Sequence, residues 1–109
     1  MRPRDLLCPK PAGLYCPPGD FYIDPVRPVG RALITHGHSD HARAGHDAVL
    51  ATAATAKIMA IRYGADFAGT TQAAGWGEPI AINGVTFTFF PAGHILGSAQ
   101  IAVSHRGLT

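Results

Sequence analysis

The chain has few charged residues, only two cysteines and no long apolar run, and each shortage excludes a class of protein. Charged residues make up 15% and apolar residues 47% of the 109 positions, which argues against a disordered chain. Cys8 and Cys16 lack CxxC spacing, so we expect reduced structural thiols. No apolar run could span a bilayer, and residues 1–10 lack a signal-peptide core. These features predict a cytoplasmic protein without membrane contact.

The net charge is small and does not define a partner. A formal charge of +2 and a pI near 8.8 permit attraction to phosphate, but so mild an excess is common in proteins that bind no nucleic acid. The length allows one domain or a piece of one, which we place over residues 1–109.

Turn residues divide the chain into short strands and one helix. The pair Asn83-Gly84 lies between two alternating apolar segments, as a type I′ hairpin requires. The order of elements predicts an α/β (α+β) fold with a mixed sheet and helices outside it. The predicted strands are residues 14–16, 21–24, 32–35, 49–52, 80–82, 85–89 and 100–104, and the predicted helix is residues 53–63, ending at Gly64.

The densest group of chemically active side chains is the run Thr-His-Gly-His-Ser-Asp-His at residues 35–41. In an extended segment, His36, His38 and Asp40 point to one side, while His41 can turn toward a neighbouring position. Two adjacent metal ions could therefore be bound. We also expect Ser39 to cap a helix that starts near Asp40. The alternative is a solvated loop that is rich in histidine, or histidines bonded to backbone carbonyls.

A second candidate lies in residues 91–100, where His94 follows a predicted strand and stands between Gly93 and Gly97. A single histidine is more often structural than a ligand. Glycines on both sides, however, allow the close backbone approach that a ligand loop needs. Together with the first run, His94 becomes a candidate for a third nitrogen ligand.

The pairing of His-x-His-x-Asp-His with a later Gly-His resembles the metallo-β-lactamase superfamily. The resemblance implies the N-terminal half of an αββα sandwich with two metal ions, zinc or alternatively manganese, in the complete site. It assigns His36, His38 and His94 to one metal, and Asp40 and His41 to the second, with Asp40 orienting the attacking water. Asp24 matches the acidic residue that in this superfamily orients the ligand loop without binding the metal, and the alternative is a turn former before Pro25.

The residues around both runs favour one branch of that superfamily. The segments 42–45 and 95–99 lack the paired glycines and the threonine of lactamase-like and glyoxalase-like members. They are similar to the nucleic-acid-processing (β-CASP-like) branch, which includes mRNA 3′-end-processing-like nucleases, and most similar to bacterial ligase-associated DNA exonucleases. Residues 21–25, 34–36 and 40–43 carry this similarity. It implies metal-dependent phosphodiester hydrolysis in DNA repair, with DNA favoured over RNA and association with a DNA ligase.

The resemblance also implies parts that these residues do not supply. Family members continue with a metal-bridging aspartate, a further histidine and a cap domain, so we expect an N-terminal fragment without appreciable nuclease activity of its own. We interpret His46 and His105 as surface or packing residues. Two alternatives stay open, a hydrolase of small esters or thioesters on the same scaffold and an inactive metal-binding fragment.

Overall fold

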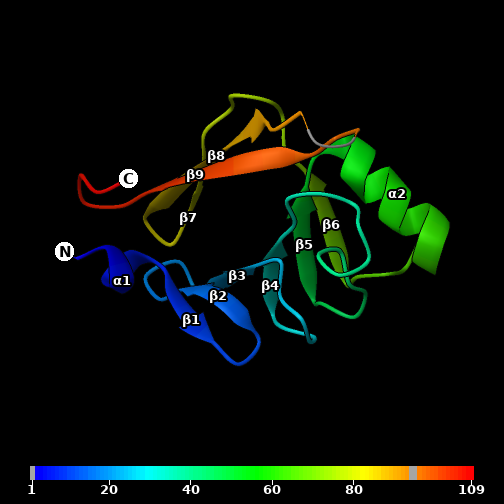
Figure 1. The fold of residues 1–109 in the computed structure, drawn as a ribbon, viewed down its shortest axis with the longest axis horizontal. Coiled ribbons are helices and arrows are strands. Elements are labelled where there is room, and N and C mark those ends of the chain that lie inside the picture. The colour runs from blue at the N-terminus through cyan, green and yellow to red at the C-terminus, as the bar shows by residue number, and fades with distance from the viewer. Residues whose placement is uncertain (1, 94–95) are drawn as a thin grey trace.

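The computed structural model describes residues 2–93 and 96–109, which form two sheets and two helices (Figure 1). The helices are α1 (Pro3–Leu6) and α2 (Ala53–Tyr63). The strands are β1 (Cys8–Lys10), β2 (Gly13–Cys16), β3 (Phe21–Ile23), β4 (Arg31–Leu33), β5 (Ala48–Ala51), β6 (Thr70–Ala73), β7 (Ile80–Ile82), β8 (Val85–Pro91) and β9 (Ala99–Ser104).

The first sheet contains the strands β1 to β6 in sequence order. The pairs from β1 to β3 are antiparallel, and the pairs from β3 to β6 are parallel. The sheet is therefore mixed, as the sequence predicts. Because β3, β4 and β5 run in the same direction, the residues that follow them gather at one edge of the sheet, a common place for binding sites.

The second sheet is antiparallel and contains β7, β8 and β9. Its hairpin turns at Asn83 and Gly84, whose φ angles are 51° and 79°. Both angles are positive, as the predicted type I′ turn demands. Alternate residues of β8 (Val85, Phe87 and Phe89) are fully buried, so one face of this sheet lies against the core.

Two apolar clusters lie on opposite faces of the first sheet. Leu33 of β4 points toward the second sheet and packs with Phe21, Phe87 and Phe89 in the cluster between the sheets. Ala32 and its alternate neighbour Ile34 point the other way and pack with Met59 of α2. The described residues thus form three layers, with α2, the large sheet and the small sheet in succession, and the fold is α+β.

Helix α2 has the bounds that the sequence predicts. Its N-cap is Thr52, whose hydroxyl accepts a hydrogen bond from the Thr55 amide at 3.3 Å, and Gly64 follows its last residue. With eleven residues, α2 is the longest helix in the described part of the chain. No helix there is long and apolar enough to cross a membrane.

The structure differs from the sequence-based expectation at two strands and two helices, one of which is the short helix α1, which was not expected. Strands β1 and β6 were not expected, since the four side chains of β6 are all exposed and show no alternation. Backbone pairing with β5 alone makes this segment a strand. The prediction that Ser39 caps a helix was wrong. Residues 39–41 form a turn in which the His38 carbonyl accepts from the amides of His41 and Ala42.

Candidate metal centre

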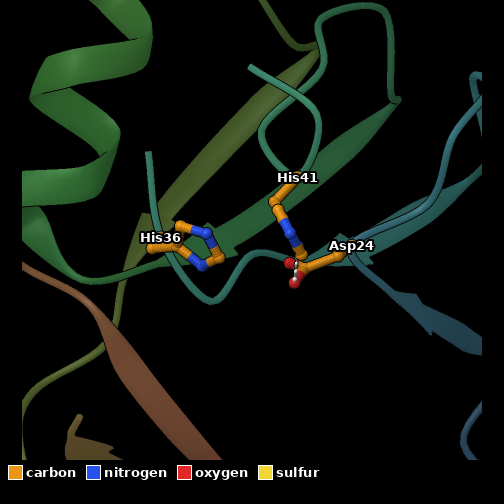
Figure 2. A group of neighbouring side chains, drawn as sticks. All are labelled: Asp24, His36 and His41. Atoms are coloured by element: carbon orange, nitrogen blue, oxygen red, sulfur yellow. Dashed lines mark hydrogen bonds and ion pairs between the residues drawn. The ribbon is translucent and has the colours of Figure 1, made fainter. Parts of the chain in front are cut away.

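The candidate site lies where two parallel strands of the first sheet end. Asp24 directly follows β3, and the histidine run begins shortly after β4, its parallel neighbour. The register pairs Ile23 with Leu33, which brings Asp24 beside the start of the histidine run. Figure 2 shows Asp24, His36 and His41 facing one another at this edge. One ligand atom of each of these three residues lies within 4.8 Å of the others.

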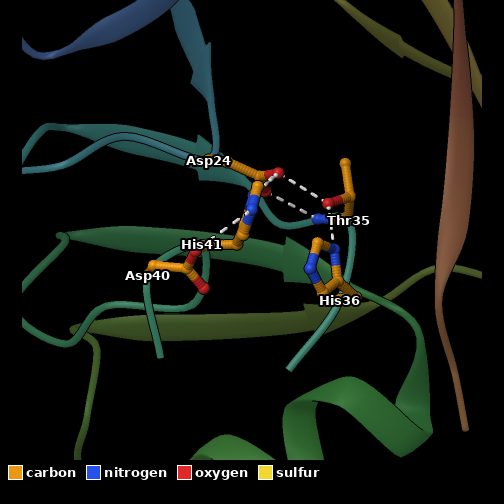
Figure 3. A network of polar contacts seen from close by, with 5 residues as sticks. All are labelled: Asp24, Thr35, His36, Asp40 and His41. Atoms are coloured by element: carbon orange, nitrogen blue, oxygen red, sulfur yellow. Dashed lines mark hydrogen bonds and ion pairs between the residues drawn. The ribbon is translucent and has the colours of Figure 1, made fainter. Parts of the chain in front are cut away.

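The carboxylate of Asp24 holds the histidine run by three hydrogen bonds (Figure 3). Oδ1 accepts from the Thr35 amide at 2.8 Å. Oδ2 accepts from the Thr35 hydroxyl at 2.5 Å and pairs with His41 Nδ1 at 2.9 Å. Asp24 has a φ of 47°, a left-handed conformation that Asp and Asn tolerate better than most residues. The backbone turn after β3 thus aims this carboxylate at the histidines.

The same hydrogen bonds assign a tautomer to His41. An ionised carboxylate only accepts hydrogen bonds, so the hydrogen between Asp24 and His41 belongs to Nδ1. The lone pair of this ring is then on Nε2, the nitrogen on the opposite edge. A histidine that donates one N–H to a carboxylate while the other nitrogen faces a metal is a common arrangement in metal sites.

Thr35 fixes the tautomer of His36 in the same way, a role that sequence reasoning missed. The Thr35 hydroxyl has one hydrogen, which it gives to Asp24 Oδ2, so its 2.8 Å contact with His36 Nδ1 requires the ring to donate. The lone pair of His36 is therefore also on Nε2. A polar β-branched residue between a buried strand and the first histidine was the only signal of this role in the sequence.

Helix α2 fixes the backbone of the histidine run from the other side. The Arg62 guanidinium donates to the Gly37 carbonyl at 2.6 Å, and the Tyr63 hydroxyl donates to the Ala42 carbonyl at 2.8 Å. A Cβ atom at Gly37 would lie 2.8 Å from Ile58 Cγ2. Close packing against α2 is therefore what requires glycine between the two histidines.

The remaining ligand candidates differ in their placement. The His38 and His36 rings meet edge to face, with centroids 5.0 Å apart, and His38 is exposed. Asp40 is 74% exposed, and its Oδ2 lies 3.7 Å from His41 Nε2. Neither belongs to the group of three within 4.8 Å. His94, the candidate third nitrogen ligand, lies outside the described residues.

The segment on the far side of His94 is anchored to the start of α2. The Gly97 carbonyl accepts from the hydroxyls of Thr52 at 2.7 Å and Thr55 at 3.1 Å. The Ala99 amide donates to the Thr35 carbonyl at 2.7 Å, which links this segment directly to the histidine run. The described end of the second motif, residues 97–99, thus lies against the first motif, although the two are far apart in the sequence.

Two further histidines lie outside the site. His46 is 1% exposed, so the packing interpretation is confirmed and the surface interpretation was wrong. Its Nδ1 accepts from the Val29 amide at 3.1 Å, and burial lowers the pKa of the ring. His105 contacts the Gly84 carbonyl through Nδ1 at 2.9 Å, in the second sheet.

Cys8 and Cys16 are free thiols, as expected.

The donors at this edge suit a borderline metal ion. Imidazole nitrogens combined with carboxylate oxygens are typical of zinc sites and are also compatible with manganese. Asp24 already accepts three hydrogen bonds of the roughly four that a carboxylate can take. Its geometry therefore favours bracing over direct ligation, and the histidine nitrogens are the better donors.

A comparison with known proteins relates the chain to one of DNA metabolism. It is 39% identical over 94 residues to a protein named "Probable DNA ligase" from Opitutus terrae. The match includes 85% of this chain, whereas the chain spans about 9% of that relative's length. No family model matches the chain.

Proposed function

We propose that this chain carries the metal-binding part of a metal-dependent phosphodiester hydrolase of the metallo-β-lactamase superfamily. Its substrate is nucleic acid, and its activity is that of a DNA exonuclease in DNA repair. The observation that carries the proposal is the contact of Asp24 with both Thr35 and His41, because one carboxylate then sets the tautomers of two histidines. A loop of solvated histidines would not need such an arrangement.

The similarity to a "Probable DNA ligase" supports DNA as the substrate class. The matched stretch is only 9% of that relative, too small a share to account for a whole ligase. We infer that it is a separate unit of DNA metabolism that acts beside the ligating part. Hydrolysis of damaged or blocked ends before ligation is a reaction that such a pairing would use.

The proposal gives each residue of the site a role. His36, His38 and His94 would hold one metal ion, and Asp40 and His41 the second. Such ions act as Lewis acids and make water a competent nucleophile at neutral pH. Asp24 and Thr35 orient the imidazoles, and Arg62 fixes the backbone between His36 and His38.

The metal site is tested by measuring zinc binding to the purified chain against a chelating dye. We expect His36→Ala and His41→Ala to weaken zinc binding at least about tenfold, since each removes a ligand. His105→Ala is the matched control, because it removes a histidine from the second sheet. If wild type binds no zinc, or if the three variants lose equal affinity, the proposed metal site is wrong.

The reaction class is tested on the full-length product of the gene. A single-stranded DNA oligonucleotide and bis(p-nitrophenyl) phosphate report phosphodiester hydrolysis, and p-nitrophenyl acetate reports ester hydrolysis. We expect zinc- or manganese-dependent cleavage of the two phosphodiesters, with mononucleotides released from the DNA. Cleavage of the acetate alone would establish the ester-hydrolase alternative, and metal binding without any hydrolysis would establish the inactive one.

A further inference from the structure

A pocket of about 540 Å³ lies beside the candidate metal centre. Its walls come from the segment after β3, from the turn at the end of the histidine run and from the end of α2. Asp40 lines this pocket and also lies 3.7 Å from His41 Nε2. A molecule in the pocket would therefore contact the same side chain that faces the metal centre.

Two arginines, Arg27 and Arg43, line this pocket and supply its positive charge. No ion pair joins either of them to a carboxylate in the part of the chain that the structure describes. The Nε atom of Arg43 is buried and has no hydrogen-bond partner there. A buried donor without a partner is costly, and a turn of the Arg43 side chain toward a ligand oxygen in the pocket would offset that cost.

The rest of the pocket is suited to a sugar or a base. Val26 and Pro28 provide apolar wall, and the ring of Tyr63 provides an aromatic one. The Tyr63 hydroxyl is bonded to the Ala42 carbonyl, which holds that ring in place. Guanidinium groups form bidentate hydrogen bonds with phosphate oxygens, and aromatic rings stack on bases of any sequence.

We propose that this Arg27–Arg43 pocket binds a backbone phosphate of single-stranded nucleic acid, next to the phosphate that is cleaved. The position next to a cleaved phosphate rests on the proposed function, whereas phosphate binding in the pocket requires no metal. Arg43 contacts the phosphate from the enclosed side and Arg27 from the open side. Together they determine how the strand enters the metal centre.

The test measures binding of a fluorescein-labelled oligothymidine strand to the purified chain by fluorescence anisotropy, with EDTA present so that no metal contributes. We expect Arg43→Gln and Arg27→Gln each to weaken binding about 5- to 10-fold at ~0.1 M salt. Each should also reduce the slope of log affinity against log salt by about one. Inorganic phosphate should compete with the strand for wild type and much less for Arg43→Gln.

Arg4→Gln is the matched control, because Arg4 is exposed in α1 and its loss changes the net charge equally. We expect it to leave binding within about twofold. Equal effects of Arg4→Gln and the two pocket variants would overturn the inference. Arg27 is exposed, so its variant keeps the test decisive even if Arg43→Gln folds poorly.

Zinc binding by the same variants separates this inference from the proposed function. Neither arginine is a candidate ligand, so zinc affinity should stay unchanged in both. A wild-type chain that binds the strand through these arginines but binds no zinc would overturn the proposed function and leave the phosphate site standing. If wild type binds zinc normally and neither arginine variant weakens binding of the strand, the phosphate site is wrong and the proposed metal site still stands.

Discussion

Asp24 and His41, which are 17 positions apart in the sequence, meet through Oδ2 and Nδ1 at 2.9 Å. The contact depends on parallel pairing of β3 with β4, which brings the end of one strand beside the loop after the other. Because the Thr35 hydroxyl shares the same oxygen, the single carboxylate acts on both ends of the histidine run.

Asp24→Asn should weaken zinc binding about 10- to 100-fold, the usual cost of losing a carboxylate that orients a ligand histidine. Asn fits the same space and tolerates the positive φ of 47°, so the backbone should not change. Competition with a chelating dye gives the affinity, and Asp47→Asn, at an exposed position just before β5, is the control. Full zinc affinity in Asp24→Asn would mean that Asp24 is only a turn former.

Thr35→Val should lower zinc affinity about tenfold, because it breaks the hydroxyl link between Asp24 and His36 while keeping the shape of the side chain. Thr35→Ser keeps the hydroxyl and should restore most of the affinity. Nitrogen NMR of the His36 ring should show the Nδ1–H tautomer in wild type and Thr35→Ser, and a mixture in Thr35→Val. A serine variant as weak as the valine variant would contradict the link.

Local patterns were enough to predict much of the fold. The apolar alternation about Asn83-Gly84 and the stop at Gly64 predicted the hairpin and α2 at their observed positions. Strand β6 could not be predicted, since its exposed side chains carry no alternation and its pairing partner is distant in the sequence. Edge strands of this kind are defined by backbone hydrogen bonds rather than by burial.

The histidine run identified the candidate ligands, but not what holds them. The hydroxyl of Thr35, the guanidinium of Arg62 and the carbonyl of Gly97 act through contacts that span 11 to 45 positions of sequence. Such contacts depend on strand order and on how α2 lies over the sheet. A single sequence does not specify either one. The sequence left His46 open between the surface and the interior for the same reason, since its hydrogen-bond partner, the Val29 amide, is 17 positions away.

Gly97→Ala should destabilise the protein by about 2–5 kcal/mol. Both Gly97 and Gly107 have a φ of 80°, so alanine at either position costs about 1–2 kcal/mol of backbone strain. At Gly97 the new Cβ would also lie 2.7 Å from Ala54 Cβ and 2.9 Å from Thr52 Oγ1, whereas at Gly107 nothing lies within 4 Å. Overpacking adds about 1–3 kcal/mol. Urea unfolding of the two variants measures the difference, and equal losses would show that the contact with α2 is loose.

His46 should make stability fall as the pH is lowered. Burial lowers the pKa of its ring in the folded state from an ordinary value of 6.5, so the unfolded chain binds the proton first as the pH falls. The contribution of the neutral ring is complete above that ordinary value and decreases below it, until the folded-state pKa is reached. Urea unfolding of wild type and His46→Gln across pH 5 to 8 tests this sign. Parallel curves for the two proteins would contradict it.

Asp40→Ala should depress DNA hydrolysis by the full-length gene product by orders of magnitude while hardly changing its stability. The side chain is 74% exposed, and substitutions at exposed positions usually shift stability by no more than about 0.5 kcal/mol. A loss of activity would therefore support the proposal that this carboxylate, beside His41 Nε2, holds the second metal and positions the attacking water. Metal content should fall from two ions toward one. Asp47→Ala, which changes another exposed carboxylate just before β5, should keep both activity and metal. If Asp40→Ala keeps full activity, or if Asp47→Ala loses as much, Asp40 is not a ligand, and the second metal must be bound elsewhere.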